Sequence, residues 1–167
     1  MIVGAPGVYR FRLPDDGWVD LDAARSAIHN AETLLTAGDP AGAMREAFVC
    51  RLISARPVLP GRTGPWIERC RTQLADLRLR SLECSARAHL VSGEPAKAVR
   101  DAQLALEVSP LREPGWRLLM DAYTAGCDIA SALDAFARCQ QTLRDALGVG
   151  PSAATREPHA AILAMAG

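Results

Sequence analysis

Apolar side chains recur with helical spacing from Asp20 onward. The first series consists of Leu21, Ala24, Ile28, Ala31 and Leu35. Spacings that alternate between three and four residues place side chains on one face of an α-helix. The pattern therefore predicts a first helix that begins near Asp20, which is a suitable N-cap. It ends at Gly38-Asp39-Pro40, where the glycine stops one helix and the proline suits the first turn of the next.

Proline and glycine divide the rest of the chain into further helices. A second apolar series is formed by Ala43, Ala47, Cys50 and Ile53. Longer helical patterns cover 66–92, 95–108, 114–125 and 129–147. A short last helix follows Ser152, and Pro158 is expected to kink it or delay its start. The chain is thus predicted to hold six or seven helices, with breaks near Gly38, 56–65, Gly93, Pro110, Gly126 and Gly148.

The first nineteen residues follow a different pattern. Residues 7–13 alternate apolar and basic side chains with period two, which is typical of a strand. Residues 14–17 (Pro-Asp-Asp-Gly) form a turn signal, and Trp18 and Val19 follow it. The pattern predicts a short N-terminal β-hairpin or strand fragment and no other sheet.

A repeat of thirty-four residues joins two of the predicted helix pairs. Shifting the chain by this length places Leu82 on Trp116, His89 on Tyr123, Ala98 on Ala132, Val99 on Leu133 and Ala102 on Phe136. Thirty-four residues is the tetratricopeptide period. The predicted fold is therefore all-α, with tetratricopeptide-like antiparallel helix pairs stacked on one another. A generic helical bundle is the alternative.

The repeat also predicts which side chains form its core. Small residues let two antiparallel helices approach closely, and large ones fill the space beside them. One helix pair cannot bury its own face, so the pairs must stack. The predicted core positions are Ala98, Trp116, Leu119, Tyr123, Ala132 and Phe136.

Charge and cysteine content favour a protein that contacts other proteins. Nineteen basic residues balance nineteen acidic ones, whereas a free-standing nucleic-acid binder usually carries a basic excess. The five cysteines form no C-x-x-C motif, which indicates free thiols in a reducing compartment. No signal-peptide pattern follows Met1, and no apolar run is long enough to span a membrane. A cytoplasmic protein without membrane contacts is expected.

The sequence offers little catalytic chemistry, and it predicts no enzyme, no cofactor and no metal. Nucleophile-elbow, phosphate-loop and dinucleotide-binding motifs are absent from it. Its three histidines are His29, His89 and His159. His29 is expected to face solvent, and His159 lies near the tail. His89 takes the place that Tyr123 fills in the next repeat, which indicates core packing.

Arginines are concentrated around the long helix predicted over 66–92. Arg69, Arg80 and Arg87 are spaced by eleven and seven residues, which keeps them on one side of that helix. Such a face could contact a phosphate backbone or an acidic partner. A solvated helix face is the more common explanation for a run of charges, and it is favoured here.

The C-terminal half resembles a known family. The run Ser109-Pro110-Leu111-Arg112-Glu113-Pro114 leads into Trp116-Arg117-Leu118-Leu119-Met120 and Tyr123, and then into Ala132-Leu133 and 136–139. Leu147-Gly148-Val149-Gly150-Pro151-Ser152 follows. These residues are similar to the bacterial transcriptional activation domain of the antibiotic regulatory proteins of actinobacteria. The resemblance extends from about Val19 to Leu163, and Pro158 departs from it.

The resemblance implies a domain division. In that family a winged helix-turn-helix DNA-binding domain precedes the helical domain, and its last hairpin is the wing. Residues 1–19 resemble a remnant of that wing, with Tyr9, Arg10 and Arg12 as its characteristic side chains, and 20–167 resemble the activation domain. DNA would then be bound only through a missing upstream domain.

Two functions remain open from the sequence. The chain is expected to be the effector half of a transcription regulator, which forms a homodimer or contacts the transcription machinery. The alternative is a free-standing helical-repeat adaptor that binds a partner peptide or protein. The wing-like segment favours the first, because an adaptor has no need of it.

Overall fold

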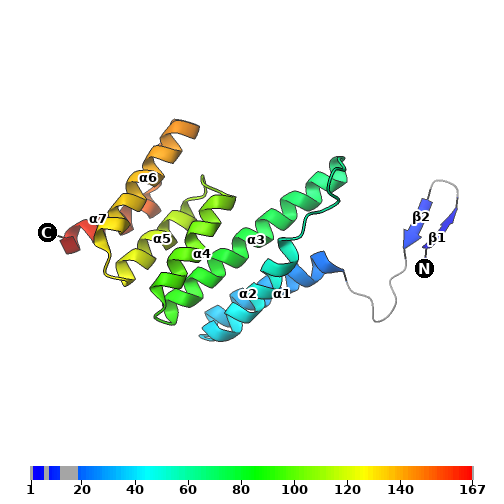
Figure 1. The fold of residues 1–167 in the computed structure, drawn as a ribbon, viewed down its shortest axis with the longest axis horizontal. Coiled ribbons are helices and arrows are strands. Elements are labelled where there is room, and N and C mark those ends of the chain that lie inside the picture. Colours follow the sequence, from blue (N-terminus) through cyan, green and yellow to red (C-terminus); the bar gives the residue numbers. More distant parts are fainter. Residues whose placement is uncertain (1, 6–7, 12–18, 167) are drawn as a thin grey trace.

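Seven helices follow one another along the chain and stack side by side (Figure 1). The computed structural model describes residues 2–5, 8–11 and 19–166. The first helix pair is α1 (Asp20–Thr36) and α2 (Pro40–Ser54), and the second is α3 (Pro65–Val91) and α4 (Pro95–Val108). The third is α5 (Glu113–Ala125) and α6 (Ile129–Leu147), which α7 (Ala153–Ala166) covers. All elements within 19–166 are helical, which agrees with the predicted all-α repeat.

The predicted N-terminal hairpin was wrong in its placement. The sequence pattern put a strand at 7–13 and a turn at 14–17, but residues 12–18 lie outside the described residues. The described strands are β1 (Ile2–Ala5) and β2 (Val8–Phe11), which pair antiparallel with Ile2 opposite Phe11. No strand belongs to the helical stack described over 19–166. The alternation at 7–13 did not reveal that its partner is the apolar segment before it.

The turns inside the three pairs share one hydrogen-bonding pattern. In each, the backbone N–H of an acidic residue donates to a carbonyl five residues earlier: Asp39 to Leu34 (2.9 Å), Glu94 to His89 (2.8 Å) and Asp128 to Tyr123 (2.9 Å). This is the bond that closes a helix end in the Schellman motif. The second and third turns are separated by the thirty-four residues that the sequence repeat predicts.

Aspartates cap the helices that follow two of these turns. The side chain of Asp39 accepts a hydrogen bond from the N–H of Gly42 (2.8 Å), and that of Asp128 accepts one from the N–H of Ser131 (3.0 Å). Such caps satisfy backbone donors that a helix start leaves unpaired. The local sequence thus fixes both the end of one helix and the start of the next.

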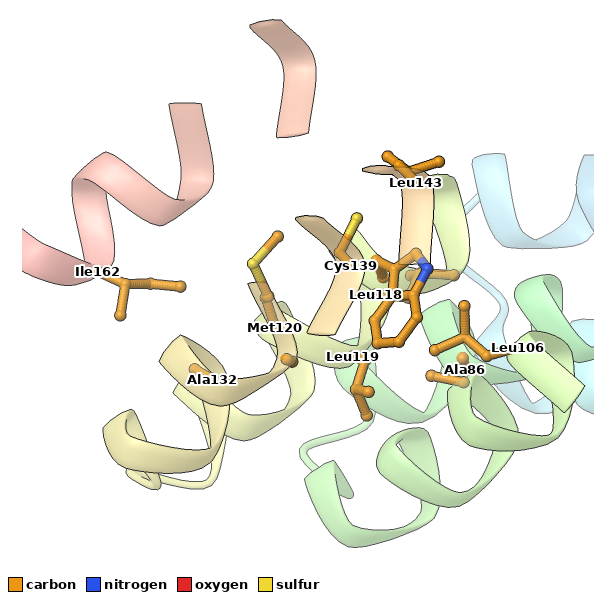
Figure 2. Close-up of a cluster of buried hydrophobic side chains, with 12 residues drawn as sticks. Ala86, Leu106, Leu118, Leu119, Met120, Ala132, Cys139, Leu143 and Ile162 are labelled. Carbon is orange, nitrogen blue, oxygen red and sulfur yellow. The ribbon is translucent and has the colours of Figure 1, made fainter. Parts of the chain in front are cut away.

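Two main groups of buried apolar side chains stabilise the stack. The N-terminal core joins α1, α2 and α3, and its most buried members are Ala24, Ile28, Ala31, Ala43, Ala47, Cys50, Cys84 and Ala88. The C-terminal core joins the end of α3 to α4, α5, α6 and α7, and includes Ala86, Leu119, Met120, Ala132, Cys139 and Ile162 (Figure 2). Alanines at helix contacts bring the backbones close, as the repeat predicts.

The last helix excludes one of the two effects expected of Pro158, a delayed start, and leaves the expected kink as a prediction. Pro158 lies inside α7, which begins at Ala153, so the proline does not delay the start of this helix. The N–H groups of Thr155 and Arg156 both donate to the carbonyl of Ser152. Ile162 is buried in the C-terminal core, and thus anchors α7 despite the proline.

Candidate interaction surfaces

The predicted core positions of the repeat lie together in the third helix pair and its neighbours. Leu119, Ala98 and Ala132 are fully buried, whereas Tyr123 and Phe136 are half-buried and pack against the C-terminal core. Their partly exposed edges leave these aromatic rings at the boundary between core and surface.

Trp116 is buried, and its indole N–H forms a hydrogen bond. Only 4 % of the residue is exposed, and its indole Nε1–H donates to the carbonyl of Pro110 (2.8 Å). The Arg138 guanidinium lies 5.7 Å from the centre of the Trp116 ring. This geometry allows a cation–π attraction, which is strongest for tryptophan.

A cleft of ≈ 500 Å³ opens beside Trp116, between α4 and α6. Trp116 and Leu119 of α5 line its floor, and its walls carry Gln103 and Glu107 of α4. Arg138 and Asp145 of α6 line the opposite side.

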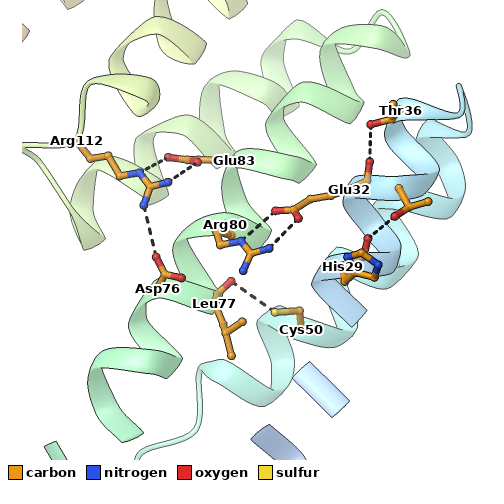
Figure 3. A network of polar contacts seen from close by, with 10 residues as sticks. His29, Glu32, Thr36, Cys50, Asp76, Leu77, Arg80, Glu83 and Arg112 are labelled. Carbon is orange, nitrogen blue, oxygen red and sulfur yellow. Dashed lines mark hydrogen bonds and ion pairs between the residues drawn. The ribbon is translucent and has the colours of Figure 1, made fainter. Parts of the chain in front are cut away.

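The arginine face expected on the long helix is not a free basic surface. Arg80 donates from Nε and Nη2 to the two carboxylate oxygens of Glu32 on α1, at 3.0 and 2.7 Å (Figure 3). This bidentate pair ties α3 to α1. Arg69 and Arg87 are exposed. Arg80 thus already has an ion-pair partner inside the domain, forty-eight residues away in sequence. The assignment of Arg69, Arg80 and Arg87 to a partner or phosphate contact stays a prediction.

His89 is largely buried, with 16% of its side chain exposed, and two carboxylates lie beside it. Its Nδ1 lies 2.8 Å from a carboxylate oxygen of Glu94, and its Nε2 lies 3.6 Å from one of Asp101. The repeat gave the position of His89, which matches that of Tyr123, but it did not predict the two carboxylates around the imidazole. His29 is exposed, as expected, and His159 stacks on Phe136 with ring centres 3.7 Å apart.

The sequence analysis missed an ion-pair cluster around Arg112. Its Nε lies 3.2 Å from Glu83 Oε1, and its Nη1 lies 3.5 Å from Asp76 Oδ1 (Figure 3). The Glu83 side chain is only 5 % exposed. The loop before α5 thus supplies the counter-charge for a carboxylate buried on α3. The only local signal was an acidic residue inside an apolar stretch of a helix.

Comparison with known proteins assigns the fold to a family. The model of the bacterial transcriptional activator domain matches residues 19–163. The chain belongs to this family. It is 31% identical over 163 residues to the regulatory protein AfsR of Streptomyces coelicolor, covering 98% of this chain and 16% of AfsR.

A solved structure gives the same assignment. Mycobacterium tuberculosis EmbR, in complex with a low-affinity phosphopeptide, has a TM-score of 0.87 and 26% sequence identity, covering 98% of this chain and 43% of that one. The chain thus spans less than half the length of either relative. Both relatives come from actinobacteria. The family is one of transcriptional activator domains and not one of enzymes.

The thiols of the activator domain are mostly buried. Cys50, Cys84 and Cys139 are buried, and burial raises the pKa of each thiol to about 11. Cys127 is exposed. Within the described residues, no group of histidine, cysteine and acidic side chains is arranged to hold a metal ion.

The remaining sequence predictions concern the N-terminus and the membrane. Tyr9 and Arg10 lie on β2, and Arg12 lies outside the described residues. Over the described part of the chain, no helix is both long and apolar enough to cross a bilayer.

Proposed function

We propose that this activator domain is the effector part of a transcription regulator and acts by binding protein, through a homodimer or through contact with the transcription machinery. The family match over 19–163 carries the proposal, together with two relatives that also regulate transcription or share that fold. EmbR was solved with a phosphopeptide, which is consistent with a protein partner for this chain.

Exposed apolar side chains provide surfaces for such contacts. Phe48 and Leu52 are about half exposed on α2, Trp66 is 59% exposed at the start of α3, and Leu147 and Leu163 are exposed near the C-terminus. Apolar groups gathered on a surface are typical of contact sites for other proteins. Helix stacks also present end faces that a neighbouring molecule can cover.

We assign DNA binding to a domain upstream of the helical stack. Tyr9, Arg10 and Arg12 would be the end of that domain, and residues 20–167 the activation domain. The chain has no net charge and lacks the general attraction for phosphates that a DNA binder relies on. In a fluorescence titration at physiological salt, the chain alone should bind promoter and scrambled DNA equally weakly. Tight, sequence-dependent binding would contradict this assignment.

A cytoplasmic location follows from the same proposal. A bacterial transcription regulator works where the chromosome lies. Free cysteines also favour a reducing compartment.

The effector role can be tested by fusing the chain to an unrelated bacterial DNA-binding domain. The fusion should change transcription from a reporter that carries the matching operator, whereas the DNA-binding domain alone should not. A reporter without the operator controls for indirect effects. An unchanged reporter, with the fusion folded and bound to the operator, would favour the adaptor alternative. Light scattering of the chain tests dimerisation separately, and a monomer at high concentration would contradict the homodimer.

A further inference from the structure

A groove lined mainly by basic side chains crosses the face formed by α2, α3 and α4, which lie side by side (Figure 1). Its cavity measures ≈ 300 Å³. The basic groups that line it are Arg51 of α2, Arg78 of α3, and Lys97 and Arg100 of α4. Arg78 also lines a neighbouring hollow of ≈ 290 Å³.

The acidic groups of this region do not balance its positive charge. Asp101 is the one carboxylate that lines the cavity, and its side chain is only 8% exposed. It is shared between Arg51, at 3.2 Å, and His89, at 3.6 Å. Lys97 is paired with Glu94 at 2.6 Å. With these pairs formed, Arg78 and Arg100 have no ion-pair partner among the described residues.

The Nε atom of Arg78 is buried and lacks a hydrogen-bond acceptor within the part of the chain that the structure describes. A buried N–H of a charged group without an acceptor is costly. Arg100 is exposed and forms no ion pair within the described residues. Both arginines line the same cavity, so an anionic group bound there would lie near two positive charges.

Apolar carbon lies next to the charges. Leu82 and Leu104 line the same cavity. At the α2 edge, the Arg51 guanidinium lies 5.5 Å from the centre of the exposed Phe48 ring. Leu52 is one helical turn beyond Phe48 and is also exposed. The groove therefore combines cations with apolar contact area.

We propose that the groove between α2, α3 and α4 binds an acidic, amphipathic peptide segment of a partner protein, with a carboxylate held by Arg78 and Arg100 and an apolar side chain packed near Leu104 and Phe48. This inference rests on the proposed effector function and names the class of its partner. A nucleic acid fits less well, because the chain has no net charge and the leucines of the cavity offer phosphates nothing.

The test uses the whole chain and a fluorescein-labelled peptide in which Asp-Glu pairs alternate with Leu and Phe. Fluorescence anisotropy should show salt-sensitive binding. A peptide with Asn and Gln in place of the acids should bind about tenfold or more weakly, equivalent to about 1.4 kcal/mol or more. Equal binding of the two peptides, or tighter binding of duplex DNA than of the acidic peptide, would overturn the proposal.

Variants localise the site. The double substitution Arg78→Gln and Arg100→Gln should weaken binding of the acidic peptide by about tenfold or more. Arg69→Gln with Arg87→Gln removes the same charge from exposed positions elsewhere on α3 and should leave the affinity nearly unchanged. Thermal melts of both variants verify folding, and the single Arg100→Gln variant replaces the double one if Arg78→Gln unfolds the chain. Equal weakening by the control pair would contradict a defined groove.

The reporter fusion separates this inference from the function on which it rests. If the fusion regulates transcription but no acidic peptide binds, the groove assignment is wrong and the effector function stands. If the acidic peptide binds but the fusion is silent, the groove exists and the effector function fails. If both hold, the Arg78→Gln and Arg100→Gln fusion should lose regulation while the Arg69→Gln and Arg87→Gln fusion keeps it.

Discussion

Cys127 occupies in the third helix pair the turn position that Gly93 occupies in the second. Both residues have a left-handed backbone, with φ of 59° and 71°, and they are thirty-four residues apart. The first pair uses Gly38 at the matching turn, with φ of 83°. A side chain with a Cβ is disfavoured in this region, whereas glycine is not. The third turn is therefore built with a strained residue.

Replacing Cys127 by glycine should stabilise the domain. We expect a gain of about 0.5–1 kcal/mol in the free energy of unfolding, since the strain is removed and part of the gain is lost to the flexibility of glycine. Cys127→Ala keeps the Cβ and should change little. In the opposite direction, Gly93→Ala should cost about 1 kcal/mol. Denaturant melts measure all three, and a Cys127→Gly variant less stable than the parent would contradict this account.

Trp116 and Trp66 should respond very differently to truncation. Trp116→Ala removes a ring that is only 4 % exposed, together with its hydrogen bond to Pro110, and should cost about 3–5 kcal/mol. Trp66→Ala removes a ring that is 59% exposed and should change stability by no more than about 0.5 kcal/mol. Chemical denaturation compares the two variants. Similar losses would show that Trp116 is not a core residue.

Removing Arg112 should destabilise the chain more than removing an exposed arginine. Arg112→Ala leaves the buried Glu83 without its counter-charge, and we expect a loss of about 2–4 kcal/mol because Arg112 itself is partly exposed. Adding Glu83→Gln should recover part of this loss, because no buried charge remains. Arg56→Ala breaks an exposed pair with Asp20 and should cost at most about 1 kcal/mol. Urea melts that show equal losses for Arg112→Ala and Arg56→Ala would refute the prediction.

Glu113 should make stability depend on pH in the acidic range. Burial acts to raise the pKa of this carboxyl, but hydrogen bonds from Thr155 and Ser152 together with Arg117 outweigh it and hold the pKa below its ordinary value of 4.5. A depressed pKa in the folded state adds stability above 4.5, and this is lost as the pH falls through the folded value.

The matched variant for this prediction is Glu113→Gln. It should lose less stability than the parent between neutral pH and the region below 4.5, because its side chain does not titrate. Thermal melts over a pH series measure the difference. Parallel pH profiles of parent and variant would show that the link from Glu113 to Ser152 at the start of α7 does not depend on charge.

Periodicity could reveal what repeats along the chain. Ala98 and Ala132 recur at a spacing of thirty-four residues, and large side chains such as Trp116 stand at fixed distances from them, so these positions follow from the sequence. The glycine and proline punctuation also located the helix ends to within a few residues. These features depend on neighbours close in sequence, and a pattern can record them.

Contacts between distant segments left no such pattern. Arg80 looked like a surface charge because Glu32, its partner, belongs to another helix pair. The repeat placed His89 in the position of Tyr123, but it did not reveal that Glu94 and Asp101 lie around it. The strand pairing was misplaced because alternation at 7–13 does not say which neighbour supplies the partner strand. Each of these differences concerns the segment that a residue contacts in the folded chain. The local sequence pattern does not determine such contacts.

The helix α3 has a consequence for how such a domain passes from one protein to another. It contains twenty-seven residues, about 40 Å of helix. Leu77 and Cys84 pack into the N-terminal core, while Ala86 packs into the C-terminal core. If a gene rearrangement separated the helices on either side of α3, the fragment without α3 would expose the apolar face that α3 covers. The fragment that kept α3 would expose one apolar side of this helix. Evolution can therefore recombine this module only whole, and a protein that acquires it gains both halves together.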